Sequence, residues 1–118
     1  MFMNTKTPEC WGNDPQAQAL RIEISPERSL LLPFEQFVFA ELTHEAKSQK
    51  LRLVFVTHEV VVRGQVLRRI ETALQRRELS NLQTVPRHHR VLVPEGQPNV
   101  SDISIIDLSA SESNDGKP

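Results

Sequence analysis

Arginine is the residue type whose spacing in this sequence most strongly suggests a binding surface. A guanidinium group is planar and permanently charged, so it can hold phosphate or carboxylate oxygens through two parallel hydrogen bonds. Arg69 and Arg76 are one heptad apart, so they align on one side of a helix, with Arg68 beside them. The candidate contacts for a partner or for phosphate groups are Arg63, Arg68, Arg69, Arg76, Arg87 and Arg90.

The distribution of charge supports this interpretation, although the formal net charge is only −1. Residues 47–93 contain ten Lys and Arg against three acids. Residues 1–46 contain three basic and seven acidic groups, and residues 94–118 contain one and five. A basic centre between acidic ends indicates either an anionic partner or ion pairs between the centre and the flanks.

The residue types that bind metals or act as nucleophiles are sparse. A zinc site needs three or four ligands, and the histidines are His44, His58, His88 and His89. His44 and His58 could meet across a hairpin, whereas His88 and His89 are adjacent and point apart. Cys10 is the single cysteine, and it lies in a polar leader that we expect to be flexible, which supplies neither a positioned base nor surroundings that lower the thiol pKa. We predict no metal-binding, cofactor-binding or catalytic residue.

Acid–base chemistry has one pair worth inspecting, His58 and Glu59, at a predicted break between strands. The sequence has four glycines and no glycine-rich phosphate loop, which argues against a nucleotide-dependent enzyme. An enzyme is therefore the third of our functional hypotheses.

The clearest elements are strands. Residues 20–24 alternate apolar and charged side chains, and residues 25–29 form a turn before a second apolar run. Residues 51–55 also alternate, but Val60 and Val62 have the opposite parity. Because a slip of one residue turns every side chain over, we expect a turn or a bulge at Thr57–Glu59 and a second strand at Val60–Arg63.

Residues 34–43 are ambiguous between a helix and a strand. Phe34, Phe37, Val38 and Leu42 fit helical spacing, and Pro33 could begin a helix. The three phenylalanines and the valine favour a strand in composition. We predict the strand, followed by a hairpin loop at residues 44–50.

One helix is expected at residues 65–79. Its apolar side chains cover an arc of about 120°, and they are Val66, Leu67, Ile70, Ala73 and Leu74. A short strand at 82–85 would complete a right-handed β-α-β crossover. Residues 100–108 would be an edge strand or a docking segment. These elements predict an α+β fold: a three- to five-stranded, mainly antiparallel sheet with one helix packed on one face.

The predicted organisation is a single domain. We expect a disordered leader at residues 1–19, an α+β domain at 20–108 and a disordered acidic tail at 109–118. No run of about 18 apolar residues occurs, so no membrane segment is expected. The single cysteine is typical of a reducing compartment, and we expect the protein in the cytoplasm.

The leading functional hypothesis is an accessory or protein-interaction module. One helix leaves the other face of a sheet uncovered, and Val38, Val54 and Val56 would form an apolar patch if they lie there. The C-terminal segment or another subunit would then have to cover the patch, and the second case is a homodimer. An acidic protein partner would instead suit the arginine face of the helix. The alternative hypothesis is a nucleic-acid-associated regulator that binds phosphates through the arginine face.

Replacing Leu67 or Ile70 with Ala should lower the free energy of unfolding by about 2–4 kcal/mol, because each change deletes buried methyl groups and leaves a cavity. Urea denaturation followed by circular dichroism measures the loss. Midpoints that hardly move for both variants would show that the helix buries a different face.

Overall fold

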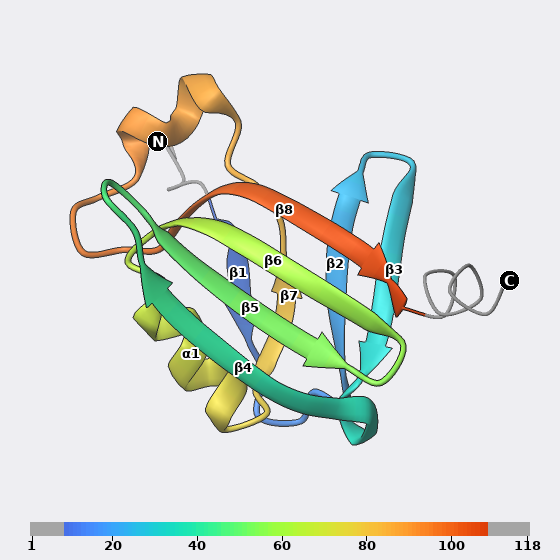
Figure 1. Ribbon diagram of the computed structural model, residues 1–118. Helices are drawn as coiled ribbons and strands as arrows, with labels where there is room; N and C mark the ends of the chain where they lie inside the picture. The colour runs from blue at the N-terminus through green and yellow to red at the C-terminus, as the bar shows by residue number, and fades with distance from the viewer. Residues whose placement is uncertain (1–8, 109–118) are drawn as a thin grey trace, which may run out of the picture.

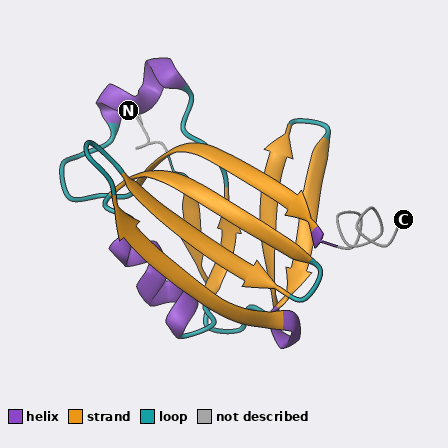
Figure 2. Cartoon of the chain, viewed as in Figure 1, coloured by secondary structure: helices purple, strands orange, loops and turns teal. Residues whose placement is uncertain are grey.

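The computed structural model describes residues 9–108 and shows a mainly-β protein, 52% strand and 18% helical. The strands form two four-stranded sheets that pack face to face (Figure 1), and strands dominate the view by secondary structure (Figure 2). The predicted α+β fold with a single sheet is therefore wrong. Two turns of helix cover too little apolar surface to bury one face of a sheet, and a second sheet covers it instead.

The first sheet has the strand order β1-β7-β2-β3. Its strands are β1 (Trp11–Asn13), β7 (Leu79–Leu82), β2 (Ala19–Ser25) and β3 (Arg28–Pro33). β2 and β3 form the hairpin that the alternation at residues 20–24 predicts, whereas β2 and β7 run parallel. Among the strand pairs of residues 9–108, β2 with β7 is the only parallel one.

The second sheet is antiparallel throughout, in the order β4-β5-β6-β8. Its strands are β4 (Phe37–His44), β5 (Gln49–Phe55), β6 (His58–Gln65) and β8 (Asn99–Asp107). The strand prediction for the ambiguous segment is confirmed, after a short 3-10 turn, η1 (Phe34–Gln36). The turn predicted near Thr57 is also confirmed, and β8 is an edge strand.

The helix α1 (Arg68–Gln75) is shorter than the predicted 65–79. β6 extends to Gln65 because Gly64 admits the neighbouring strand: a Cβ at this position would collide with the carbonyl oxygen of Asn99. Val66 then adopts a φ of 56°, and Arg77 a φ of 58° beyond the other end of the helix. Left-handed backbone breaks the helical run at both points.

The predicted β-α-β crossover is also wrong, because α1 joins the two sheets. It leads from β6 in the second sheet to β7 in the first. A further 3-10 segment, η2 (Arg87–Leu92), stands away from the sheets before the chain returns in β8 (Figure 1).

The core lies between the inner faces of the two sheets and beneath α1. The first sheet contributes Leu20, Ile22, Leu32, Leu79 and Leu82, the second Leu51, Leu53, Phe55, Val60 and Val62, and the helical segment Leu67, Ile70, Ala73 and Leu74. These side chains are at most 3% exposed. The alternation read from the sequence thus identifies the buried faces correctly, and four of the five predicted helical core residues are buried.

The described part of the predicted disordered leader is ordered, which corrects that boundary. Cys10 is buried and Trp11 packs against the core. The Cys10 carbonyl accepts a hydrogen bond from the amide of Gln83 at 2.9 Å, and the amide of Asp14 donates to the carbonyl of Glu78 at 2.7 Å. Residues 1–8 and the predicted tail, 109–118, lie outside the described residues.

If β1 is part of the domain, Trp11→Ala should destabilise it by about 1–3 kcal/mol, because the half-buried indole covers core side chains. Gln16→Ala is the matched control on the exposed loop after β1 and should change stability by less than about 0.5 kcal/mol. Urea midpoints compare the two. Equal midpoints would contradict the docking of β1.

Candidate interaction surfaces

The outer face of the second sheet is divided into an apolar end and a charged end. Opposed residues in a sheet share a face, so the strand register gives the neighbours directly. One row across β4, β5, β6 and β8 consists of Phe39, Val54, Glu59 and Ile106. The next two rows are Glu41, Arg52, Val61 and Ser104, and then Thr43, Lys50, Arg63 and Asp102.

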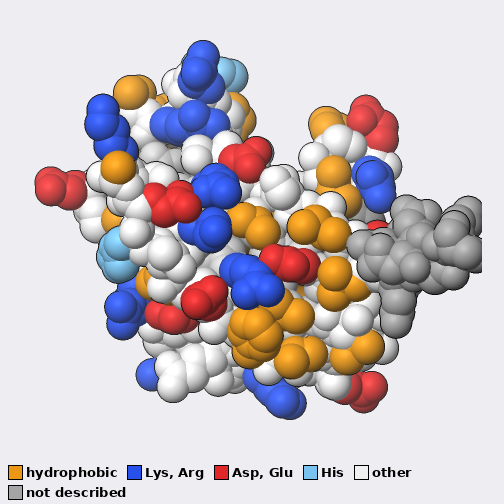
Figure 3. All heavy atoms as spheres, in the orientation of Figure 1, with side chains coloured by type: hydrophobic (Ala, Val, Ile, Leu, Met, Phe, Trp, Pro, Cys, Tyr) orange, Lys and Arg blue, Asp and Glu red, His pale blue; other side chains and the backbone are white. Residues whose placement is uncertain are grey.

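Five side chains at the first end make up what we call the apolar patch: Val38, Phe39, Val54, Val56 and Ile106. Val56 is 63% exposed, Val38 56%, Ile106 45% and Phe39 44%. A register shift between Phe37 and Phe39 turns Val38 outward. Hydrophobic side chains gather visibly over this end of the sheet (Figure 3). Val38, Val54 and Val56, which the sequence suggested for an uncovered sheet face, therefore all lie on the outer face of the second sheet.

Arg52 stands at the border between the two ends. Its Nε lies 2.6 Å from Oε2 of Glu59, and its Nη1 lies 3.7 Å from Oε1 of Glu41. The guanidinium carbon is also 5.3 Å from the ring centroid of Phe39, which is cation–π geometry. The charge of Arg52 is thus balanced within the chain, and its flat group covers part of the apolar patch.

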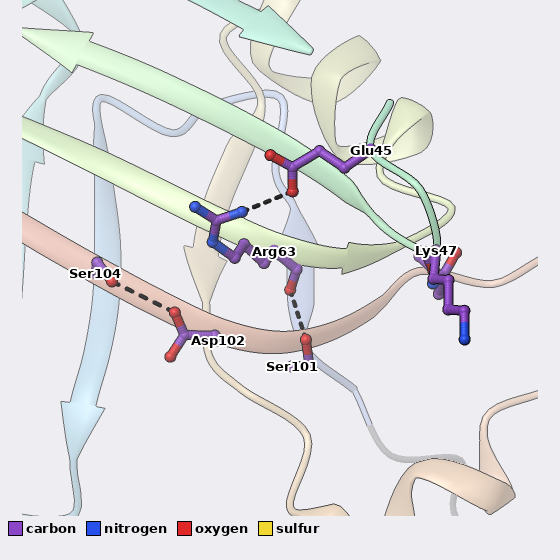
Figure 4. Close-up of polar contacts among 7 residues, drawn as sticks. Glu45, Lys47, Arg63, Ser101, Asp102 and Ser104 are labelled. Atoms are coloured by element: carbon purple, nitrogen blue, oxygen red, sulfur yellow. Dashed lines mark hydrogen bonds and ion pairs between the residues drawn. The ribbon is translucent and has the colours of Figure 1, made fainter. Parts of the chain in front are cut away.

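Arg63 belongs to the charged end of the same face (Figure 4). Its Nη1 lies 2.7 Å from Oε1 of Glu45 in the β4–β5 loop, and its carbonyl accepts a hydrogen bond from the hydroxyl of Ser101. The adjacent Ser104 hydroxyl donates to Asp102. The charge of Arg63 is therefore paired with Glu45 within the chain, and Arg63 lies in β6 and not in the helix that carries the other arginines.

The three helical arginines do lie together, on the exposed side of α1. Arg68 forms an ion pair with Glu71 at 3.4 Å, in which the Arg68 side chain is 72% exposed. Arg69 donates from Nη1 to the side-chain oxygen of Gln97 at 2.9 Å. The Arg76 backbone amide donates to the Thr72 carbonyl at 3.2 Å, but its guanidinium group has no hydrogen bond or ion pair with another residue of the described range 9–108.

Arg87 and Arg90 are in η2, and their environments differ. Arg90 donates from Nε to the Val85 carbonyl at 3.2 Å and from Nη2 to the Ser101 carbonyl at 3.1 Å, so it ties η2 to β8. Arg87 is exposed. The six candidate arginines therefore occupy three places, because the chain between Gly64 and Arg90 crosses from one sheet to the other.

The histidines and the thiol form no reactive cluster in the described part of the chain. His58 hydrogen-bonds with Thr57 at 2.7 Å and lies 4.0 Å from Asp107, at a hollow of about 270 Å³ between the sheets. His44 contacts Gln49 and not His58. Within residues 9–108, no three His, Cys, Asp or Glu side chains are placed to hold a metal ion.

Burial governs the chemistry of Cys10. Desolvation of the thiolate raises the pKa of the Cys10 thiol, and hydrogen bonds from backbone groups oppose that shift only in part. The thiol donates to the carbonyl of Pro98 at 3.4 Å. A buried thiol of raised pKa is a weak nucleophile, so Cys10 acts as a small core side chain.

Comparison with protein-family models, with curated proteins and with solved structures finds no match to this chain. Among residues 9–108, no helix has the length and apolar character needed to cross a membrane. The geometry of the surfaces is therefore the basis for the functional proposals that follow.

The two arginines of η2 offer a matched comparison. Arg90→Gln should lower stability by about 1–3 kcal/mol, because two backbone carbonyls lose charged donors. Arg87→Gln should leave stability within about 0.5 kcal/mol, since the side chain is exposed. Thermal denaturation of both variants checks this, and equal losses would show that Arg90 does not tie η2 to β8.

Proposed function

We propose that this protein is an accessory or protein-interaction module. The outer face of its second sheet, which carries the apolar patch, would dock on a second copy of the chain. The single observation that carries the proposal is the apolar patch, with Val38 and Val56 more than half exposed. Apolar side chains that are contiguous on a surface favour association, because contact removes them from water.

The charges on this face favour a protein partner over a nucleic acid. Binding to a phosphate backbone draws on cations that are not already neutralised. Here Arg52 is paired with Glu59 and Glu41, and Arg63 with Glu45. Each of the two rows next to the patch contains both acidic and basic side chains, so the charges on this face largely offset one another.

The mixed signs favour a second copy as the occupant. A two-fold axis brings a surface against itself, so each basic group needs an acid on that same surface. An axis through the apolar patch would put apolar side chains together. Arg52 of one copy would then approach Glu41 of the other. The Glu41 side chain is available for this contact because it is 62% exposed and its ion pair with Arg52 of its own chain is long, at 3.7 Å.

The magnitudes favour a weak dimer. Burying a fully exposed Val, Ile or Phe side chain contributes about 1.5–3 kcal/mol, so a half-covered one adds roughly 1 kcal/mol. Association costs at least about 4 kcal/mol in lost translation and rotation, and the cost can be much larger. We therefore expect a dimer that forms at high protein concentration and dissociates on dilution.

The proposed setting is the cytoplasm, where a lone cysteine stays reduced.

Sedimentation velocity from low micromolar to several hundred micromolar protein tests the proposal. The unaltered chain should shift from monomer to dimer, and Val38→Glu/Val56→Glu should stay monomeric because charged groups resist desolvation. Leu31→Glu is the matched control: Leu31 is 54% exposed on the first sheet, outside the patch. It should dimerise like the unaltered chain.

Circular dichroism confirms that each variant is folded before the comparison. An unaltered chain that remains monomeric throughout would overturn self-docking. Equal loss of the dimer in Leu31→Glu would also overturn it, because the effect would then come from added charge and not from the patch.

A further inference from the structure

A groove runs along β1, the edge strand of the first sheet. The apolar patch lies on the other sheet. One hollow of about 520 Å³ lies between residues 9–13 and the loop that carries Pro94, Gln97 and Pro98. A second, of about 240 Å³, lies between β1 and α1. The two hollows share Trp11 and Asn13, and we call them together the β1 groove.

The sequence of α1 supplies one wall of this groove. Arg69, Thr72 and Arg76 are spaced i, i+3 and i+7, so they form one stripe along the helix. All three line the smaller hollow, together with Ala73. Ala73 is buried and small, which lets β1 approach the helix.

The cations of this stripe are not neutralised by acids within the described residues. The Arg69 guanidinium donates to the neutral amide oxygen of Gln97, and the Arg76 guanidinium has no partner in residues 9–108. Of the neighbouring acids, Glu71 pairs with Arg68, and Glu78 accepts a hydrogen bond from Asn13. Glu9 lines the larger hollow and not the smaller one.

Trp11 provides a flat apolar surface beside these cations. The indole packs against the core on one side, yet it lines both hollows. A half-buried aromatic ring is held in place and can stack on a planar ligand group. Guanidinium groups next to such a ring are the elements that hold a phosphate and its attached base.

We propose that the β1 groove binds a nucleotide, with phosphate groups on Arg69 and Arg76 and the base against Trp11. Seven residues of helix span about 10 Å, so the two arginines can hold different phosphates of one ligand. A nucleoside triphosphate and a short single-stranded oligonucleotide share this chemistry. This site is independent of the proposed dimer, which uses the second sheet.

An extended acidic peptide is the competing occupant, and the edge strand argues against it. β1 has three residues and a register shift between Gly12 and Asn13. Short, bulged edge strands are poor templates for an added strand. Recognition in the groove is therefore assigned to side chains and not to the backbone of β1.

The intrinsic fluorescence of the protein reports on this groove directly, because Trp11 is the only tryptophan in the sequence. The full chain is titrated with adenosine triphosphate, a short oligothymidylate, inorganic triphosphate and hexaglutamate, with free tryptophan as the control for absorbed light. We expect saturable quenching by one or both nucleotide ligands, with an affinity that falls as salt is added. The nucleotide that binds more tightly identifies the source of the ligand.

A pair of double variants separates the groove from general charge. Arg69→Gln/Arg76→Gln should weaken nucleotide binding about tenfold or more, which corresponds to one charged contact. Arg28→Gln/Arg87→Gln removes two exposed arginines elsewhere and should bind like the unaltered chain. Thermal denaturation of both should show a folded protein, since the changed side chains are exposed.

Three results would overturn nucleotide binding in the groove, and a fourth would overturn the placement of the base against Trp11. The first is the absence of quenching by either nucleotide at millimolar concentration, and the second is equal binding by the two double variants. The third is quenching by hexaglutamate without quenching by a nucleotide, which would assign the groove to an acidic peptide. Quenching by inorganic triphosphate with the same affinity as the nucleotides would show that Trp11 contributes no stacking.

Discussion

The mutual burial of the two inner sheet faces is the constraint on which the rest of this structure depends. Leu51, Leu53 and Val62 of one sheet and Leu20 and Ile22 of the other are all fully buried. Within residues 9–108 neither sheet has another cover of sufficient size, because α1 is eight residues long. Each sheet is therefore the solvent shield of the other, and α1 closes the side at which the chain passes between them.

Packing on one face leaves the outer faces to water, and the two candidate sites arise in different ways from that fact. The apolar patch exists because the outer face of the second sheet is not uniformly polar along its strands. The β1 groove exists because a three-residue edge strand and α1 meet without filling the space between them. One site contains internal ion pairs around Arg52, whereas at the other the guanidinium group of Arg76 has no partner in the described residues.

The arginines illustrate how far spacing can be trusted. Arg69 and Arg76 share a stripe because helical periodicity is local, and the sequence predicts it. Arg63 and Arg90 are near the helix in the sequence but do not join its arginine stripe. Arg63 pairs with Glu45, and Arg90 donates to the backbone carbonyls of Val85 and Ser101. Trp11 escaped prediction because three residues are too few to display a strand period. The signal available in the sequence was the adjacent pair Cys10 and Trp11 in an otherwise polar segment.

The sequence by itself determined the strands between Ala19 and Gln65, their buried parity, the hairpin turns and the buried side of the helix, because each depends on neighbours a few residues apart. It missed β1 and placed the strand after the helix at 82–85 instead of Leu79–Leu82. Only the tertiary structure decided that Leu20–Leu32 and Leu51–Val62 belong to different sheets and that residues 10–13 join the first. A single sheet and two packed sheets bury the same apolar strand faces, so the periodicity of the sequence cannot distinguish them. The choice depends on the direction the chain takes at η1 and at Val66, and those turns bring Trp11 to the arginines of α1.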